Sequence, residues 1–341
     1  MTSAATRCIA LKAGFTASIA AAALLLNISD AVGAPAVKLR LASALPADQN
    51  SSFFVWYERF QANLNAATNS AIEITYFGNG MLGKEADAAQ QVRLGGVDMM
   101  ISGTSIWATL APEIGVLDLG YLFRSYDHVG RALDGKAGEL LADGLQKKAN
   151  VKILGYGYSF GARNVYSKKP IKVPTDLQGV KIRVLPTPNF IATFKAMGAT
   201  AVPMPFGEVY SGLQMGVIEG LEQDAANVLD AKFYEVAKYC TLTQHVFAPL
   251  VMVMNPASFD KIPAQYKPAV LKAAAEATDF ERKRAIEAET RAFDELKKRG
   301  VTVSEIDRDY FRNAVKPVWT DFIKRYPDMQ VVIDAAEAAK K

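Results

Sequence analysis

Residues 157–161, GYSFG, fit the GxSxG pattern that surrounds the nucleophile of many serine hydrolases. Asp224 or Asp230, followed by His245, would complete with Ser159 the Ser, Asp, His order of an α/β-hydrolase triad. That chemistry requires a sharp turn from a strand into a helix, because the turn exposes the serine Oγ. The residues after Ser159 instead favour a turn and a second β run. A secreted serine hydrolase is therefore an alternative hypothesis that lacks its expected helix.

Residues 78–84, GNGMLGK, match two nucleotide-binding patterns. The three glycines form a GxGxxG between a predicted strand and a predicted helix, but the strand is the second in its domain, and Asp98 downstream does not clearly end a strand. Together with Lys84 the segment also fits a phosphate-binding loop, except that Glu85 stands where a Ser or Thr should bind magnesium. A carboxylate there would repel phosphate. We interpret the segment as a glycine-rich turn between a strand and a helix.

The composition excludes other kinds of site. The chain has 341 residues, 39 Lys and Arg against 35 Asp and Glu, and 50% hydrophobic residues, which suggests two globular domains. A formal net charge of +4 gives little support for nucleic acid as a partner. Cys8, Cys240, His128 and His245 are the only Cys and His residues, too few for a zinc cluster. We predict no metal, no cofactor and a buried, inert Cys240.

The first 36 residues have the order of a secretory signal peptide. Arg7 and Lys12 precede the uncharged apolar run 13–26, and small and polar residues follow up to Ala36, near which we expect cleavage. The run is too short for a membrane span, which needs about 20 apolar residues. No later run reaches that length, so we expect export without membrane insertion of the mature chain.

Short β-rich runs alternate with helical patterns in the rest of the chain. The predicted strands are residues 37–42, 72–76, 97–101, 151–158, 181–184, 201–203 and 250–255, and the predicted helices are 51–68, 84–94, 126–133, 138–148, one from 188, and 206–215. This alternation predicts an α/β fold with a largely parallel sheet. Residues 264–299 are rich in Ala, Glu, Lys and Arg, and they predict one helix of roughly 50 Å. Its apolar residues are too sparse for a coiled coil, so we expect a strut across two domains.

Several motifs, in order, carry a family resemblance. They are 81–85 (MLGKE), 179–184 (GVKIRV), 205–214 (PFGEVYSGLQ), 216–222 (GVIEGLE) and 232–239 (KFYEVAKY). Together they resemble the DctP-type solute-binding proteins of TRAP transporters, from about Val37 to beyond Trp319. An ABC-type solute-binding protein, which shares the fold class without these motifs, is a further alternative.

The resemblance implies a two-lobed periplasmic binding protein, each lobe a mixed, largely parallel sheet flanked by helices, with the long helix spanning both lobes. Lobe I would comprise residues 37–160 and about 249–288, and lobe II residues 161–248 and about 289–341. It also implies a protein that catalyses nothing and delivers an organic acid to the small and large membrane subunits of a TRAP permease. We predict a hydroxylated monocarboxylate, such as a sugar acid, over which the lobes close.

The resemblance also implies the binding residues. The family arginine at Arg183 forms a salt bridge with the ligand carboxylate, a role that suits the two parallel hydrogen bonds of a guanidinium. Arg163 matches a second arginine of members that bind larger sugar acids.

The remaining predicted site residues each have a structural alternative. Phe206 would pack on the carbon skeleton of the ligand or belong to the core, and Glu85 would bind hydroxyl groups or stabilise the start of its helix. Gln223 replaces a frequent ligand-binding Asn of the family. Asp224, where Pro is common, would bind a ligand hydroxyl or amine, or cap the following helix.

Overall fold

The computed structural model describes residues 36–49 and 51–340, without the side chains of 159–161, so the predicted signal peptide lies outside it apart from Ala36. Its strands are β1 (Val37–Ala42), β2 (Ile72–Phe77), β3 (Met99–Gly103), β4 (Lys152–Ser167), β5 (Lys181–Val184), β6 (Thr200–Pro203), β7 (Gly220–Gln223), β8 (Tyr239–Met254) and β9 (Thr302–Ser304). Its α-helices are α1 (Ser52–Thr68), α2 (Glu85–Leu94), α3 (Tyr126–Asp134), α4 (Lys136–Ala149), α5 (Pro188–Ala196), α6 (Val209–Gln214), α7 (Ala225–Asp230), α8 (Pro256–Asp260), α9 (Lys267–Lys298), α10 (Arg308–Ala314), α11 (Lys316–Arg325) and α12 (Gln330–Ala338). Short 3-10 helices connect them, among them η1 (Thr104–Thr109), η2 (Pro112–Asp118) and η4 (Phe206–Glu208).

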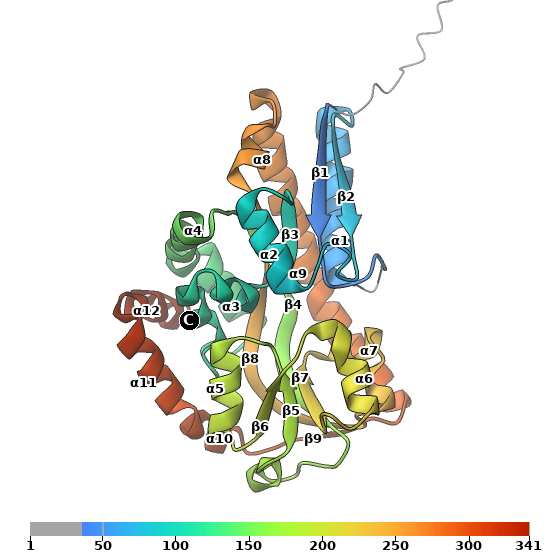
Figure 1. Cartoon of the computed structure of the whole chain (residues 1–341), viewed down its shortest axis with the longest axis vertical. Helices are drawn as coiled ribbons and strands as arrows, with labels where there is room; N and C mark the ends of the chain where they lie inside the picture. Colours follow the sequence, from blue (N-terminus) through green and yellow to red (C-terminus); the bar gives the residue numbers. More distant parts are fainter. Residues whose placement is uncertain (1–35, 50, 341) are drawn as a thin grey trace, which may run out of the picture. The chain divides into compact units, whose positions relative to one another are not determined.

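The described strands form one mixed sheet, which confirms the α/β class. The order is β2-β1-β3-β8-β4-β7-β5-β6, with β9 on β8 (Figure 1). Toward its two ends the pairs β1–β2, β1–β3, β5–β6 and β5–β7 are parallel. The long strands β4 and β8 are antiparallel between them. The structure thus has parallel strands at both ends, joined through two long central strands.

Strands β4 and β8 pair from Lys152↔Met254 to Ser167↔Tyr239, with four register shifts along the way. The turn predicted within residues 162–170 is therefore wrong where it would interrupt the strand, because β4 continues without a break from Lys152 to Ser167. Bulges at register shifts increase twist and bend a strand without ending it. Such a strand contributes to both ends of the sheet.

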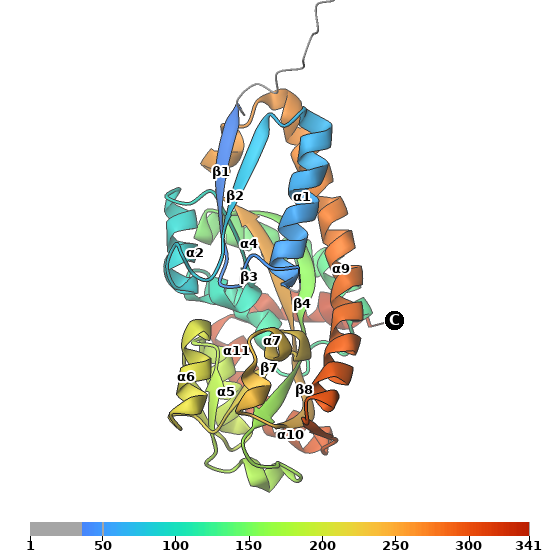
Figure 2. The ribbon, with the colours of Figure 1, turned by 90° about the vertical axis from the view of Figure 1, so that its right-hand side faces the viewer.

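Helix α9 confirms the predicted long helix. It packs on α1, β4 and α7, so it contacts elements beside both ends of the sheet (Figure 2). Two glycines of β4 permit this approach: a Cβ at Gly155 would lie 2.3 Å from Thr278 Oγ1, and one at Gly157 would lie 2.3 Å from Glu281 Oε2. The Tyr158 backbone N–H donates to Glu281 Oε2 at 3.0 Å, which ties the helix to the strand.

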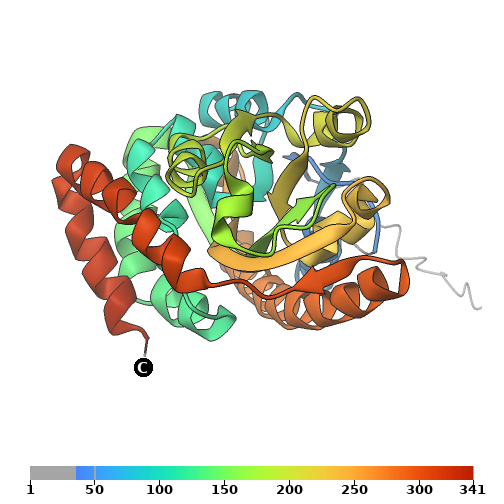
Figure 3. The ribbon, with the colours of Figure 1, turned by 90° about the horizontal axis from the view of Figure 1, so that it is seen from below.

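The C-terminal helices α10–α12 come after the last strand, β9, and their segment is drawn in red in Figure 3. Helix α11 packs on α5, and α12 packs on α3 and α4. The His128 Nε2 lies 2.7 Å from the carbonyl oxygen of Ala336, which attaches α12 to α3. Residues 330–338 therefore pack on residues predicted for lobe I, and the lobe boundaries stay a prediction. None of the helices within 36–49 and 51–340 has the length and apolar character that a membrane crossing requires.

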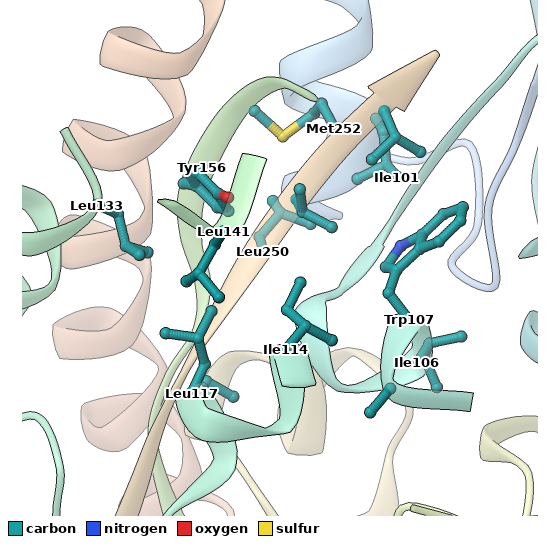
Figure 4. Packing of buried hydrophobic residues seen from close by; sticks show 14 of the residues in the cluster. Ile101, Ile106, Trp107, Ile114, Leu117, Leu133, Leu141, Tyr156, Leu250 and Met252 are labelled. Atoms are coloured by element: carbon teal, nitrogen blue, oxygen red, sulfur yellow. The ribbon is translucent and has the colours of Figure 1, made fainter. Parts of the chain in front are cut away.

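The largest hydrophobic core lies around β3 and β8. Ile101, Trp107, Leu250 and Met252 are all buried there, and Figure 4 shows them with side chains from η1, η2 and the neighbouring helices. Residues 250–254 of β8 have no exposed surface, as expected for a strand covered on both faces. This core anchors one end of β8, while the other end carries buried polar side chains.

Candidate functional site

Four adjacent strands carry ionisable side chains that have no exposed surface. They are His245 on β8, Arg163 on β4, Glu222 on β7 and Arg183 on β5, and these strands neighbour one another in the sheet. Fully buried charges are rare and costly unless they are paired. We call these four residues the arginine cluster.

Arg163 and Glu222 form a bidentate ion pair. Arg163 Nε donates to Glu222 Oε2, and Nη2 donates to Oε1 and to the backbone carbonyl of Glu222, both at 3.0 Å. The guanidinium carbon also lies 5.3 Å from the ring centre of Phe190. Burial alone would raise the pKa of Glu222, but Arg163 and His245 lower it to about 2. Glu222 is therefore ionised at neutral pH.

Arg183 is only partly paired. Its Nε donates to the carbonyl oxygen of Met204 at 2.9 Å, and its Nη1 lies 4.0 Å from Glu222 Oε1. Neither Nη1 nor Nη2 has a hydrogen-bond partner among the residues that the structure describes. Burial lowers the pKa of Arg183 to about 10, so the side chain stays charged at neutral pH. Two buried donors of one guanidinium can bind both oxygens of a carboxylate.

His245 completes the cluster as a neutral group. Its Nδ1 lies 2.9 Å from Thr243 Oγ1, and its Nε2 lies 3.5 Å from Glu222 Oε2. Burial lowers the pKa of His245, and the nearby Glu222 opposes this effect. At neutral pH the imidazole therefore adds no charge.

Two carboxyl groups outside these strands interact electrostatically with the cluster. Asp118, at the end of η2, accepts a hydrogen bond from Ser105 Oγ at 2.6 Å, and its Oδ2 has no partner among the described residues. Burial raises the pKa of Asp118 to about 7, against the effect of Arg163. Glu85 is the first residue of α2, and burial raises its pKa while Arg183 and Arg163 lower it.

The predicted residues Gln223, Asp224 and Phe206 have internal partners. Gln223 Oε1 accepts from the backbone N–H of Asp224 at 3.1 Å. Asp224 caps α7, since its oxygens accept from Asn227 N at 2.9 Å and Asn227 Nδ2 at 2.7 Å. Phe206 is half-buried and packs edge to face on Phe233, with 5.4 Å between the two ring centres. For Asp224 and Phe206 the observed contacts are those of the structural alternatives.

The structure thus brings the predicted residues Arg163 and Arg183 to one shared acid, Glu222, and the predicted Glu85 interacts electrostatically with both arginines. Sequence reasoning missed Glu222 and Asp118 as site residues, and it considered His245 only as a hydrolase histidine. A signal for Glu222 is its strand, where a single charged residue separates buried positions. The pattern of a buried acid opposite buried arginines is visible only once strand neighbours are known.

The enzyme patterns do not form their required geometry. Ser159 lies inside the continuous strand β4, so residues 157–161 make no strand–turn–helix elbow. His245 contacts Thr243 and Glu222, while Asp224 caps a helix. The serine hydrolase hypothesis is therefore wrong in its structural premise.

The glycine-rich segment 78–84 is a turn between β2 and α2, with positive φ angles of 66° at Gly80 and 112° at Gly83. Only glycine adopts such angles at no steric cost. Within the described residues, no group of three or more His, Cys, Asp or Glu side chains could hold a metal ion.

Comparison with known proteins identifies relatives of this chain. Residues 44–325 match the family model "Bacterial extracellular solute-binding protein, family 7". The 2,3-diketo-L-gulonate-binding periplasmic protein of Escherichia coli is 36% identical over 292 residues, which cover 85% of this chain and 88% of that protein.

Solved structures agree with this match. A TRAP periplasmic solute-binding protein of a Sulfitobacter species with bound β-D-galacturonate has a TM-score of 0.83 and 31% identity, covering 87% of this chain and 98% of that one. The sugar acid binding protein of Advenella mimigardefordensis in complex with galactonate has a TM-score of 0.84 and 29% identity. The match covers 89% of this chain and 98% of that one.

Proposed function

The chain belongs to family 7 of the bacterial extracellular solute-binding proteins, as its motifs predicted, and on this premise we propose that it is the receptor for a sugar acid or a similar hydroxylated monocarboxylate. The ligand carboxylate binds Arg183, and the protein delivers the acid to the small and large membrane subunits of a TRAP permease. It is exported to the periplasm through residues 1–36 and catalyses no reaction.

The observation that carries this proposal is the incomplete pairing of Arg183. Its Nη1 and Nη2 are buried and lack hydrogen-bond partners within the described part of the chain. An unpaired buried donor is destabilising, so such a group is explained when a ligand supplies the acceptor. A carboxylate fits both nitrogens at once, whereas a hydroxyl or an amide oxygen fits one at a time.

Two relatives with bound sugar acids support the ligand class, since galacturonate and galactonate each carry one carboxylate and several hydroxyl groups. In this chain, Glu85 at the start of α2 interacts electrostatically with both arginines and would accept hydrogen bonds from ligand hydroxyls. Gln223, Arg163, Phe206 and Asp224 would surround the ligand in supporting roles. Their side chains have the internal partners described above.

A thermal-unfolding screen tests the proposal. The mature protein would be melted with D-galacturonate, D-glucuronate, galactonate, amino acids and uncharged sugars. A ligand at a hundredfold excess over its Kd stabilises the folded state by about 2.7 kcal/mol. We expect stabilisation by at least one sugar acid. Stabilisation by amino acids or uncharged sugars, with none by the acids, would contradict the proposal and favour another type of binding protein.

A further inference from the structure

Thr187 carries a buried hydroxyl group at the start of helix α5. It is the N-cap residue of α5, it comes three residues after the end of β5, and it is 1% exposed. A threonine at the N-cap usually accepts a hydrogen bond from a backbone N–H in the first turn of its helix. Thr187 makes no such bond, and its Oγ1 has no hydrogen-bond partner among the described residues. The usual structural role of an N-cap threonine therefore does not explain this hydroxyl.

Two prolines fix the backbone around the hydroxyl. Pro186 and Pro188 flank Thr187, and a residue before proline is restricted to extended conformations, in agreement with φ −128° and ψ 148° at Thr187. The Thr187 N–H donates to the carbonyl oxygen of Leu185 at 2.7 Å, and its carbonyl oxygen accepts from the N–H of Ile191 at 3.2 Å. The backbone of Thr187 is thus paired and held in place, while its side-chain oxygen is not.

The first turn of α5 lies beside the arginine cluster. Phe190, in this turn, has its ring centre 5.3 Å from the guanidinium carbon of Arg163. Strand β5, which leads into Thr187, carries Arg183 and is parallel to both of its neighbours, β6 and β7. In α/β proteins, ligands bind beyond the carboxyl ends of parallel strands, at the start of the helix that follows. Thr187 therefore has the position of a ligand contact next to a carboxylate on Arg183.

Sugar acids offer a suitable atom close to their carboxylate. An aldonate carries a hydroxyl group on C2, and a uronate in its ring form carries the ring oxygen on the carbon that bears the carboxylate. We call this atom the α-oxygen. It accepts a hydrogen bond in both kinds of acid, and a threonine hydroxyl is able to donate one.

We propose that Thr187 is a specificity-determining residue, whose hydroxyl donates a hydrogen bond to the α-oxygen of the ligand while Arg183 binds the carboxylate. This inference rests on the proposed function, because it assumes a carboxylate on Arg183. It predicts that the protein prefers acids with an α-oxygen to the deoxy acids of the same carbon skeleton.

Titration calorimetry with the best-binding sugar acid tests the contact. Thr187→Val removes the hydroxyl at nearly constant shape, and it should weaken binding at least about fivefold. Thr187→Ser keeps a hydroxyl and should bind within about threefold of the wild type. Thr193→Val is the matched control, because Thr193 lies further along α5, is fully buried and also has an Oγ1 without a partner among the described residues. Its affinity should stay within about twofold of the wild type. Wild-type affinity in Thr187→Val would overturn the inference.

The stability of the unliganded protein separates a ligand contact from a structural role. Because Thr187 Oγ1 caps no N–H, Thr187→Val should have a free energy of unfolding in urea that equals or exceeds that of the wild type. A less stable Thr187→Val would show that the hydroxyl serves the fold, and would overturn the inference.

Matched ligands identify the atom that Thr187 contacts. 2-Deoxy-D-gluconate lacks only the C2 hydroxyl of D-gluconate, and 2-deoxygalactonate lacks only that of galactonate. We expect the wild type to bind the hydroxy acid of the better pair at least about tenfold more tightly than its deoxy acid. This preference should fall at least about fivefold in Thr187→Val. The same preference in both proteins would overturn the inference and leave the proposed function intact.

A crystal structure of the wild type with its best sugar acid decides the matter if Thr187→Val does not fold or if only uronates bind. We expect Thr187 Oγ1 within about 3.2 Å of the α-oxygen. A longer distance, with the carboxylate on Arg183, would overturn the inference alone. A wild type that no sugar acid stabilises in the thermal screen would overturn the proposed function together with the inference.

Discussion

Two buried polar clusters of this protein differ in how completely their atoms are paired. Asp98, which is 8% exposed, accepts hydrogen bonds from the backbone N–H of Arg40 at 2.8 Å and from Ser258 Oγ at 2.6 Å. Asn255 donates to the carbonyl oxygen of Val92 at 2.7 Å and accepts from the N–H of Ala257 at 2.9 Å. These contacts connect β1, α2 and α8 to Asp98, the residue before β3. Both carboxylate oxygens of Asp98 therefore already accept a hydrogen bond within the protein.

The arginine cluster has the opposite property. Two nitrogens of Arg183 and one oxygen of Asp118 lack partners within the described residues. A fully paired buried network stabilises and specifies a fold, whereas a partly paired one costs stability. We infer that the complete pairing of Asp98 and Asn255 serves the fold, and that the two unpaired donors of Arg183 serve a ligand carboxylate.

The largest expected effect is on affinity at Arg183. Arg183→Ala removes both donors and leaves the ligand carboxylate buried without a partner, which should cost roughly 2–5 kcal/mol, or about thirtyfold to several thousandfold in affinity. Arg183→Lys keeps the charge but not the two-donor geometry, so its loss should be intermediate or equal. Titration calorimetry with the best sugar acid measures both. Arg284→Ala on α9, at a half-exposed arginine, is the control. Wild-type affinity in Arg183→Ala would remove the arginine cluster from the binding site.

At Asp98 we expect the opposite pattern, a loss of stability with little change in ligand affinity. Asp98→Ala leaves the buried Ser258 hydroxyl and the Arg40 N–H without an acceptor, so the free energy of unfolding should fall by about 1–3 kcal/mol. Ligand affinity should stay within about twofold of the wild type, because nearly all molecules of the variant are still folded. Urea unfolding and calorimetry on one preparation measure both quantities. A large affinity loss at unchanged stability would break the distinction between the two clusters.

The unpaired Asp118 should make the stability of the protein depend on pH. Burial raises its pKa from 3.8 to about 7, so the folded state holds this proton more tightly than the unfolded state does. The resulting stability is fully present below about pH 4 and is lost as the pH rises toward 7, by at most about 1.4 kcal/mol per pH unit. Asp118→Asn keeps an acceptor for Ser105 and cannot titrate. Between about pH 4 and 7.5 the free energy of unfolding of the unliganded protein should fall less steeply in this variant than in the wild type. Identical slopes of the free energy against pH would contradict the raised pKa of Asp118.

The smallest effect is expected at an exposed ion pair. Lys84 Nζ lies 2.6 Å from Glu208 Oε1, and it connects the β2–α2 turn to η4, which follows β6. Exposed pairs contribute little, so Lys84→Ala should weaken binding by less than about fivefold. The difference from the wild type should vanish at high salt, because screening removes it in both proteins. A salt-independent loss in Lys84→Ala would instead indicate a direct ligand contact.

Elements with regular polar and apolar patterns could be predicted from the sequence, and elements that bury polar side chains could not. Strands β1 and β5 were predicted with their observed bounds, and α9 within a few residues, because their polar and apolar residues follow regular patterns. Strand β7 and the first half of β8 were missed. They bury Glu222, Gln223, Thr243 and His245, whose residue types indicate a surface.

The same residues are those of the arginine cluster and its immediate neighbours. Arg183 could be predicted from its apolar flanks and the family resemblance, but its partner Glu222 could not, because strand order determines which side chains meet. A strand that departs from the hydrophobic pattern, such as GLEQ in β7, is therefore where a binding site is to be expected.

A crystal structure of the protein with its best sugar acid tests the central claim most directly. We predict that the two oxygens of the ligand carboxylate lie about 3 Å from Nη1 and Nη2 of Arg183. Arg163 should keep its contacts with Glu222, and the hydrogen bonds of Asp98 should be unchanged. A carboxylate bound elsewhere, with Nη1 and Nη2 of Arg183 still unpaired, would contradict the account.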